Sequence, residues 1–223
     1  MPSSQFDFIA PKGCRKCQRL ADFIDSHREK HPEWHNGPVP SFGSIDAPTL
    51  ILGLAPGLRG ANATGRPFTG DFAGKVLYDA LLKIGLASGR YDAHIEDSLH
   101  LNHVRIANAV RCVPPQNKPI AAEIAMCRPY LSDELARMKN LKDIFVLGRI
   151  AHETVLRHFG LKLADYAFSH DQELSLPNGL KLVSSYHCSR YNVQTNRLKV
   201  EEFDKVCQRL KALICTQSLS AAL

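Results

Sequence analysis

The sequence predicts an α/β fold: a single-domain, three-layer α/β/α architecture around a central, mainly parallel, four-stranded sheet. The first observation behind this prediction is that short apolar runs alternate along the chain with longer segments whose apolar residues recur at helical spacing. Such alternation is typical of a parallel sheet with helices on both faces. The second observation is size. A chain of 223 residues, 44% of them hydrophobic, suffices for one substantial core, and we expect residues 1–223 to form one domain.

Four apolar runs are expected to form the strands, at residues 49–53, 104–110, 143–147 and 182–186. Four helices are expected at residues 74–86, 119–138, 150–158 and 198–214. The N-terminal part, residues 1–47, carries a first pair of cysteines. Residues 26–48 are rich in His, Pro, Gly and Ser, and we expect them to be irregular. Functional residues of such sheets lie in loops at the carboxyl ends of the strands. We therefore expect one edge to gather residues 53–71, 108–119, 148–149 and 187–197.

Charge and hydropathy indicate which kinds of binding partner the protein can have. The net charge of +6 is compatible with a polyanionic partner, but many cytosolic proteins are equally basic. The sequence holds neither an apolar run of the roughly 20 residues that span a bilayer nor an N-terminal secretory pattern. We therefore expect a cytoplasmic protein of bacterial or archaeal type, without a membrane partner. Nothing in the sequence demands an oligomer, so a monomer is expected.

The seven cysteines fit a metal site better than a disulfide framework, because their number is odd and a cytoplasmic chain keeps thiols reduced. Cys14 and Cys17 form a C-x2-C pair in a polar, basic stretch, and two further thiolates would complete a set of four. Cys112 and Cys127 are the candidates, although free cysteines are also often small buried apolar residues. The spacing does not separate zinc from a [4Fe–4S] cluster, since both accept four thiolates.

The first predicted strand runs into a glycine-rich loop. Residues 53–57 read Gly-Leu-Ala-Pro-Gly, and glycine lets backbone N–H groups approach a ligand closely. The loop matches neither the Walker pattern nor the dinucleotide fingerprint. Phe68 lies in a polar stretch with no obvious core to join, which indicates a stacking surface for a planar ring. Asp71 precedes a predicted helix, so it is a candidate carboxylate for the site or an ordinary helix N-cap.

Two further strand ends carry polar residues. Asn108 offers a donor and an acceptor together, as needed to recognise the edge of a base, and the alternative is an Asx turn. His187 follows the last predicted strand, where a lone histidine is more often structural. The loop after it suits phosphate contact and stacking, through Ser189, Arg190, Tyr191, Asn192 and Arg197.

In combination, these segments resemble the uracil-DNA glycosylase superfamily, and within it the thermostable-type iron–sulfur enzymes of the type B branch. The resemblance extends from Cys14 to about Arg197. Its most specific parts are the four-cysteine spacing and residues 53–57, 64–71, 108–112 and 114–117. Each part alone is weak, but all of them occur in the order that the family has.

The resemblance implies a monofunctional glycosylase of base-excision repair, which flips uracil out of double-stranded DNA and hydrolyses its N-glycosidic bond. Hypoxanthine and xanthine are further expected substrates. It implies a structural [4Fe–4S] cluster on Cys14, Cys17, Cys112 and Cys127. It implies a catalytic set of Asp71, Asn108 and His187. The implied base pocket consists of Gly53, Ala55, Pro56, Gly57, Phe68 and Asn108.

The sequence departs from the family pattern in two places. Other branches position water with an acidic or amide side chain where this chain has Leu54 and Ala55. The usual His-Pro-Ser motif reads His187-Cys188-Ser189, and losing the proline is expected to loosen the turn that aims the histidine. Two alternatives remain open: a mismatch-specific glycosylase for G·T pairs or etheno-adducts, and a non-catalytic zinc-bearing nucleic-acid-binding module.

Overall fold

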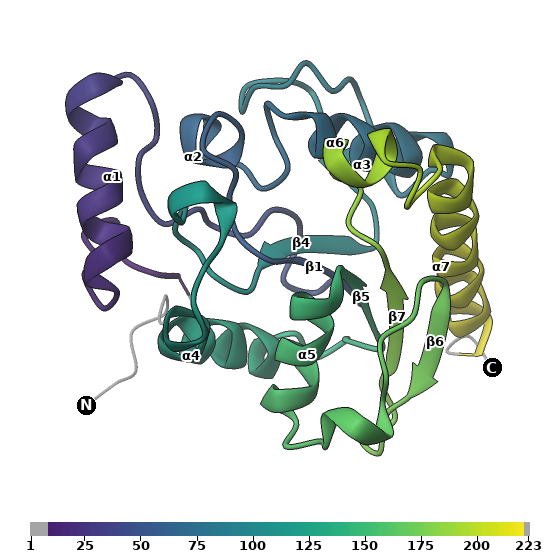
Figure 1. Ribbon diagram of the computed structural model, residues 1–223. Coiled ribbons are helices and arrows are strands. Elements are labelled where there is room, and N and C mark those ends of the chain that lie inside the picture. The colour runs from purple at the N-terminus through teal and green to yellow at the C-terminus, as the bar shows by residue number, and fades with distance from the viewer. Residues whose placement is uncertain (1–8, 221–223) are drawn as a thin grey trace.

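A computed structural model describes residues 9–220 and contains a five-stranded sheet with helices on both faces (Figure 1). The strands lie in the order β4-β1-β5-β7-β6, and only β6 runs antiparallel to its neighbour. Their bounds are β1 (Thr49–Gly53), β4 (Val104–Asn108), β5 (Asp143–Leu147), β6 (Gln172–Ser175) and β7 (Lys181–Ser185). The predicted α/β fold with a mainly parallel sheet is thus confirmed.

The register aligns the carboxyl ends of the four parallel strands. Gly53 at the end of β1 lies opposite Asn108 at the end of β4. On the other side of β1, Leu147 at the end of β5 lies opposite Ser185 at the end of β7. Each strand therefore delivers its following loop to one edge of the sheet.

The two faces of the sheet bury alternate residues. Ile51, Ile106 and Phe145 face a core that they share with α3 (Phe72–Lys83) and α7 (Val200–Ser220). Their neighbours Leu50 and Ile144 face the opposite core, which includes residues of α4 (Ala121–Arg137) and α5 (Arg149–His158). Because both faces are covered, the strands are apolar along most of their length.

The remaining elements surround this sandwich. α1 (Gln18–Lys30) packs Leu20 and Ile24 into a third apolar cluster that also contains Tyr130 of α4. The others are short: α2 (Ala61–Thr64), β2 (Ala87–Ser88), β3 (His100–Leu101), η1 (Pro115–Asn117), η2 (Leu163–Asp165) and α6 (Arg190–Gln194). Among the helices of residues 9–220, none is both long and apolar enough to pass through a bilayer.

Two sequence predictions were wrong. The sheet has five strands instead of four, because β6 pairs with β7 at the edge, and a turn containing Asn178-Gly179 connects the two strands. The Gln-Glu-Leu-Ser sequence of β6 carries little apolar signal, so its pairing with β7 determines its structure. The segment 26–48 is not irregular throughout, because α1 continues to Lys30.

Candidate active site

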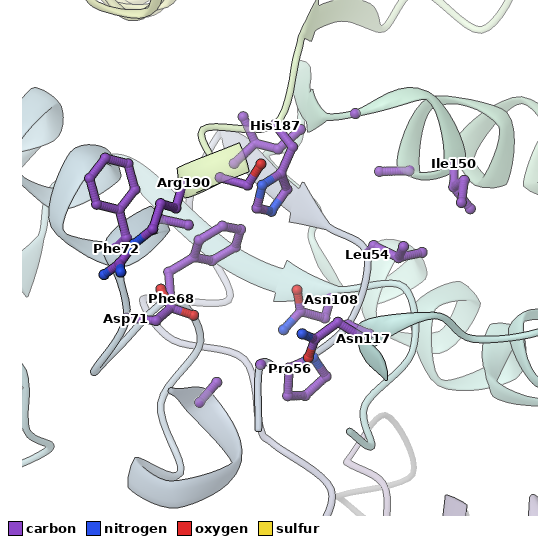
Figure 2. A pocket seen from close by; sticks show the side chains of 18 of the residues that line it. Leu54, Pro56, Phe68, Asp71, Phe72, Asn108, Asn117, Ile150, His187 and Arg190 are labelled. Carbon is purple, nitrogen blue, oxygen red and sulfur yellow. The ribbon is translucent and has the colours of Figure 1, made fainter. Parts of the chain in front are cut away.

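A cavity of about 750 Å³ opens at the carboxyl edge of the sheet (Figure 2). Loops after β1, β4, β5 and β7 all contribute to its wall. The residues predicted for the site that line it are Ala55, Pro56, Gly57, Phe68, Asp71, Asn108, His187, Ser189 and Arg190. The structure therefore brings together side chains that are up to 135 positions apart, as the predicted topology requires.

Gly53 at the end of β1 makes room for the two residues that define the inner wall. A Cβ at this position would lie 2.5 Å from Asn108 Oδ1 and 2.7 Å from Phe68 Cζ. These distances are shorter than contacts that real Cβ atoms make, so any side chain here would displace Asn108 or Phe68. Gly53 was predicted as part of the base pocket, but it does not itself line the cavity, and the role that the structure gives it is steric.

Asn108 is only 3% exposed, and its side-chain amide forms no hydrogen bond with another residue in the range 9–220. The alternative of an Asx turn is therefore wrong. The amide lines the cavity and keeps its donor and acceptor available there. Asn108 is therefore suited to bind the edge of a planar base.

Phe68 joins the core instead of standing apart from it, which the sequence did not predict. Its side chain is 6% exposed and belongs to the cluster between the sheet and α3. One part of the ring still borders the cavity, where it lies 5.8 Å from the His187 ring at an interplanar angle of 24°. Its backbone has a φ of 53°, a left-handed conformation that is rare for an aromatic residue.

His187 faces the cavity from the end of β7 and is partly buried. Burial lowers the pKa of its imidazole below the ordinary 6.5, while the nearby carboxylate of Asp71 opposes that shift. The ring is therefore neutral at pH 7 and acts as a hydrogen-bond donor or acceptor, without a positive charge. Asn192 fixes the turn behind it by donating to the His187 carbonyl over 2.8 Å.

Cys188 replaces the family's proline with a different anchor. Its side chain is fully buried, and the Sγ donates to the Ala73 carbonyl in the first turn of α3 over 3.4 Å. This contact joins the His187 turn directly to the helix that begins after Asp71. The loosening expected from the missing proline is therefore opposed by packing and by this hydrogen bond.

Asp71 serves as the N-cap of α3, since its Oδ1 accepts the Gly74 N–H over 2.8 Å. The second oxygen faces the glycine-rich loop, where a Cβ on Gly57 would lie 2.9 Å and a Cβ on Gly60 2.6 Å from Oδ2. The N-cap interpretation is confirmed, and the same carboxylate still lines the cavity. One oxygen is thus engaged by the helix while the other remains directed toward the site.

The predicted DNA-binding loop divides into two groups. Ser189 and Arg190 border the cavity, and the Arg190 guanidinium lies over the Phe72 ring at 5.6 Å. Tyr191 lies outside the cavity wall and is 71% exposed. Asn192 binds the His187 carbonyl, and Arg197 stacks on Tyr186 at 4.7 Å, so both are engaged within the protein.

Several residues in the cavity wall had no role assigned from the sequence. Asn117 reaches the cavity from η1 with a φ of 55°, and Figure 2 shows it beside Pro56 and Asn108. Its signal was the Pro-Pro-Gln-Asn run that follows β4. Arg149 and Ile150 begin α5. The sequence placed residues 148–149 at this edge of the sheet but suggested no function for them. Arg59 and Phe72 also line the cavity.

The four predicted metal ligands lie around a second, small cavity beside α1 and α4. Cys112 and Cys127 are buried, whereas Cys14 and Cys17 are partly exposed. Burial, reinforced by the neighbouring thiols, raises the pKa of Cys17 to about 11 and that of Cys112 to about 12. Without a bound cation, Cys17 and Cys112 therefore stay protonated at pH 7.

Four thiols that line one cavity are a donor set that both zinc and an iron–sulfur cluster accept. Among the described residues, no group of three or more Cys, His, Asp or Glu side chains has the arrangement of a single-ion site. The chemistry of the donor set therefore fits a metal centre and leaves the choice between zinc and a cluster open.

Comparison with known proteins agrees with this site. The profile of the "Uracil DNA glycosylase superfamily" matches residues 40–211, which include the whole sheet. The chain therefore belongs to the uracil-DNA glycosylase superfamily, and the resemblance found in the sequence is confirmed at this level.

Relatives within the superfamily narrow the class. A type-5 uracil-DNA glycosylase of Thermus thermophilus is 42% identical over 90% of this chain and 93% of its own length. A type-5 uracil-DNA glycosylase of Pyrobaculum aerophilum is 34% identical over 89% of this chain and 88% of its own length. A type-4 uracil-DNA glycosylase of Sulfurisphaera tokodaii is 26% identical over 78% and 75% respectively. The chain is thus more similar to these type-5 enzymes than to this type-4 enzyme.

Proposed function

We propose that the protein is a uracil-DNA glycosylase of the type-5 kind, which hydrolyses the N-glycosidic bond of uracil in DNA during base-excision repair and leaves an abasic site. The names of the relatives support the substrate. The observation that carries the proposal is the inner wall of the cavity. There the unpartnered Asn108 amide and the Phe68 ring meet in space that Gly53 leaves free, which suits the edge and the face of a planar base.

Breaking the glycosidic bond places negative charge on the base and positive charge on the sugar, so the enzyme must stabilise both. The neutral His187 donates a hydrogen bond to the departing base. Backbone N–H groups of the turn at residues 53–57, apart from Pro56, which has none, assist it. Asp71 stabilises the sugar cation or orients the attacking water through the oxygen that α3 does not use. Asn108 holds the base edge during the reaction.

The target base must leave the stack before it reaches this cavity, at a cost of roughly a few kcal/mol that is smallest for mispaired bases. A uracil opposite guanine is therefore the favoured substrate. Leu54 and Ala55 carry no acidic or amide side chain, so this part of the wall offers no polar side chain that would select one base over another. Hypoxanthine and xanthine are proposed further substrates for this reason.

Cys14, Cys17, Cys112 and Cys127 would hold a structural [4Fe–4S] cluster, which supplies thiolate–iron bonds that join α1, the loop after β4 and α4. The backbone N–H of Arg111 already donates to Cys127 Sγ over 3.3 Å, as expected around a thiolate ligand. Iron and acid-labile sulfide in the purified protein test this assignment. A colourless protein that carries one zinc ion would contradict it.

The activity is tested by alkaline strand cleavage of a duplex with one uracil opposite guanine. We expect cleavage by the wild type and a loss on the order of 100-fold or more for His187→Ala, because an anion-stabilising donor is removed. Asp71→Ala is expected to lose activity as well. Matched controls are His100→Ala and Asp79→Ala, which change exposed residues outside the cavity wall.

Inactivity of a cluster-loaded wild type toward uracil, hypoxanthine and xanthine alike would contradict the proposal. Activity on G·T or etheno-adduct duplexes alone would assign the cavity to a mismatch-specific enzyme. Binding of DNA without excision of any base would identify a non-catalytic module.

A further inference from the structure

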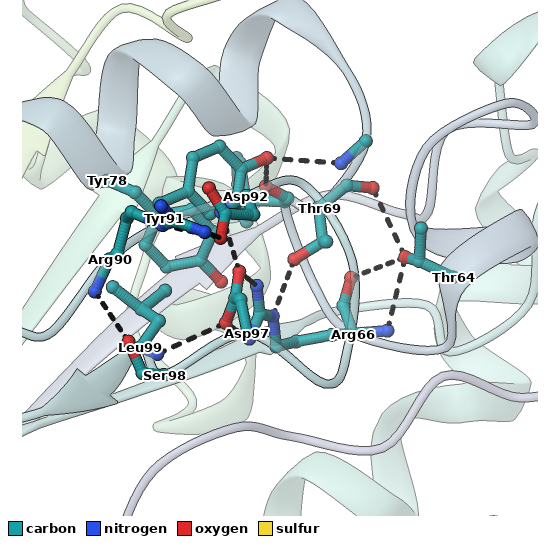
Figure 3. A network of polar contacts seen from close by, with 12 residues as sticks. Thr64, Arg66, Thr69, Tyr78, Arg90, Tyr91, Asp92, Asp97, Ser98 and Leu99 are labelled. Carbon is teal, nitrogen blue, oxygen red and sulfur yellow. Dashed lines mark hydrogen bonds and ion pairs between the residues drawn. The ribbon is translucent and has the colours of Figure 1, made fainter.

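Residues 65–71 connect α2 to α3 and form the Phe68 loop. A polar network that the mechanism does not use packs against this loop (Figure 3). The left-handed backbone of Phe68 is a conformation that a residue with a side chain keeps only when its surroundings enforce it. The carbonyl of Phe68 is also tightly packed, because a Cβ on Gly74 would lie 1.7 Å from it. The surroundings must therefore determine the position of this backbone closely.

Three hydroxyl groups from outside the loop bind its backbone. Tyr78 donates to the Pro67 carbonyl over 2.6 Å, and Tyr91 donates to the Phe68 carbonyl over 3.4 Å while accepting the Gly70 N–H over 3.1 Å. Thr64 donates to the Thr69 carbonyl over 3.2 Å. The backbone on either side of Phe68 is thus fixed by side chains, with little contribution from regular secondary structure.

A buried ion pair supports these hydroxyl groups. Arg66 binds both carboxylate oxygens of Asp97 at 2.6 and 2.7 Å, and the two side chains are only 4% and 0% exposed. The same guanidinium donates to Thr69 Oγ1 over 2.8 Å. It lies 5.6 and 5.8 Å from the ring centroids of Tyr78 and Tyr91, so it holds the tyrosines as well as the loop.

Asp97 belongs to the connection between β2 and β3, for which the sequence suggested no function. It accepts the backbone N–H groups of Asp92 and Leu99 at 3.0 and 3.2 Å, which fixes that connection around the carboxylate. Neither Asp97 nor Arg66 nor Tyr91 lines the cavity. Their contacts reach the cavity wall through the backbone of Phe68 and Gly70.

We propose that Arg66, Asp97 and Tyr91 are positioning residues that clamp the Phe68 loop and so present the Phe68 ring to the extruded base. This inference rests on the proposed glycosylase function, which it deepens by naming the residues that set the stacking contact. Loss of the clamp releases the Phe68 ring and so weakens the hold on the base.

The test is a double-mutant cycle between Tyr91→Phe and Phe68→Leu, measured as single-turnover excision of uracil below saturation. Tyr91→Phe removes one hydroxyl and keeps the ring, so we expect about a three- to tenfold lower rate in the wild-type background. In the Phe68→Leu background the same change should have no further effect. Tyr166→Phe is the matched control, because Tyr166 lies outside both the network and the cavity wall.

Equal losses in both backgrounds, or no loss in the wild-type background, would overturn the proposal. Amide hydrogen exchange of the peptide 66–72 gives a readout that needs no activity. Exchange there should be faster in Tyr91→Phe than in Tyr166→Phe, and unchanged exchange would likewise refute the clamp. A wild type that excises no base would contradict the proposed function, while the exchange measurement would still decide whether the clamp exists.

Discussion

The Phe68 loop and the His187 turn face the same cavity, but the protein holds them by different means. Phe68 is positioned by the Arg66–Asp97 ion pair and by hydroxyl groups of residues up to 23 positions away. His187 is positioned by its own turn, through Asn192 five residues later and the thiol of the adjacent Cys188. One region is a network of charges and hydroxyls, and the other is a short turn pinned to α3.

This difference predicts which property, stability or rate, a substitution in each region affects first. The network concentrates its stability in one buried ion pair, and breaking such a pair leaves an uncompensated charge. The turn depends on weaker, separate contacts. Each contributes little to the fold but acts directly on the position of the His187 ring. Changes to the network should therefore reduce stability first, whereas changes to the turn should reduce rate first.

The largest expected effect comes from breaking the ion pair. Asp97→Asn leaves the guanidinium of Arg66 buried without a counter-charge, so we expect a loss of about 3–5 kcal/mol in the free energy of unfolding. Urea unfolding monitored by circular dichroism measures it. Asp92→Asn is the control, because the ion pair of Asp92 with Arg90 is mostly exposed and should matter little. Equal stability of the two variants would refute the contrast.

A smaller effect is expected in the turn. Cys188→Ala removes the hydrogen bond to the Ala73 carbonyl, and we expect about a three- to tenfold lower excision rate because His187 loses its link to α3. Cys207→Ala is matched for burial, since Cys207 is also fully buried but lies in α7. Both variants should lose similar stability, and only Cys188→Ala should lose rate. A rate loss shared by both would show that packing alone is responsible.

The smallest effect concerns pH. The pKa of His187 is lowered below 6.5 by burial, so the neutral ring and its stability contribution persist above pH 6.5 and are lost as the pH falls through the lowered value. We therefore expect an almost constant excision rate between pH 8 and 6.5 and a decline in more acidic buffer. His187→Gln should abolish that decline. A rate that rises on acidification would instead indicate a protonated, cationic histidine.

The Phe68 loop and the His187 turn should also differ in the pH at which acid affects them. Burial alone would raise the pKa of Asp97, but Arg66 and two backbone N–H groups outweigh it and lower that pKa to about 2. The stability from this ion pair is complete above the ordinary value of 3.8 and disappears only as the pH falls through about 2. Excision should therefore fail in mild acid while the exchange protection of residues 66–72 persists. Simultaneous loss of both would contradict the comparison.

The sequence predicted the parallel strands and the edge that carries the site, because each buried strand has a continuous apolar run followed by an unusual loop. Asn108 and His187 were placed correctly for this reason, since a strand end fixes where the next residue points. Asp71 was predicted in two ways, as an N-cap and as a carboxylate of the site, and one side chain serves the helix while lining the cavity.

Other features depend on tertiary contacts that no local pattern records. β6 is polar and exists as a strand through pairing with β7. The partnership of Arg66 with Asp97 joins residues 31 positions apart, and only the folded chain brings them together. The burial of Phe68 was missed because its neighbours in sequence are polar, while the residues that cover it come from the sheet and α3.

The alignment of four strand ends has a consequence for when the site forms during synthesis of the chain. The inner wall and the proposed partners of the base edge and of the leaving group follow β1, β4 and β7. Of these strands, β7 is the last along the chain to join the sheet. A chain emerging from the ribosome has no working site until residue 187 has been synthesised and the whole sheet has closed. Base excision therefore requires the complete sheet, and a translation product that ends before residue 187 removes no base.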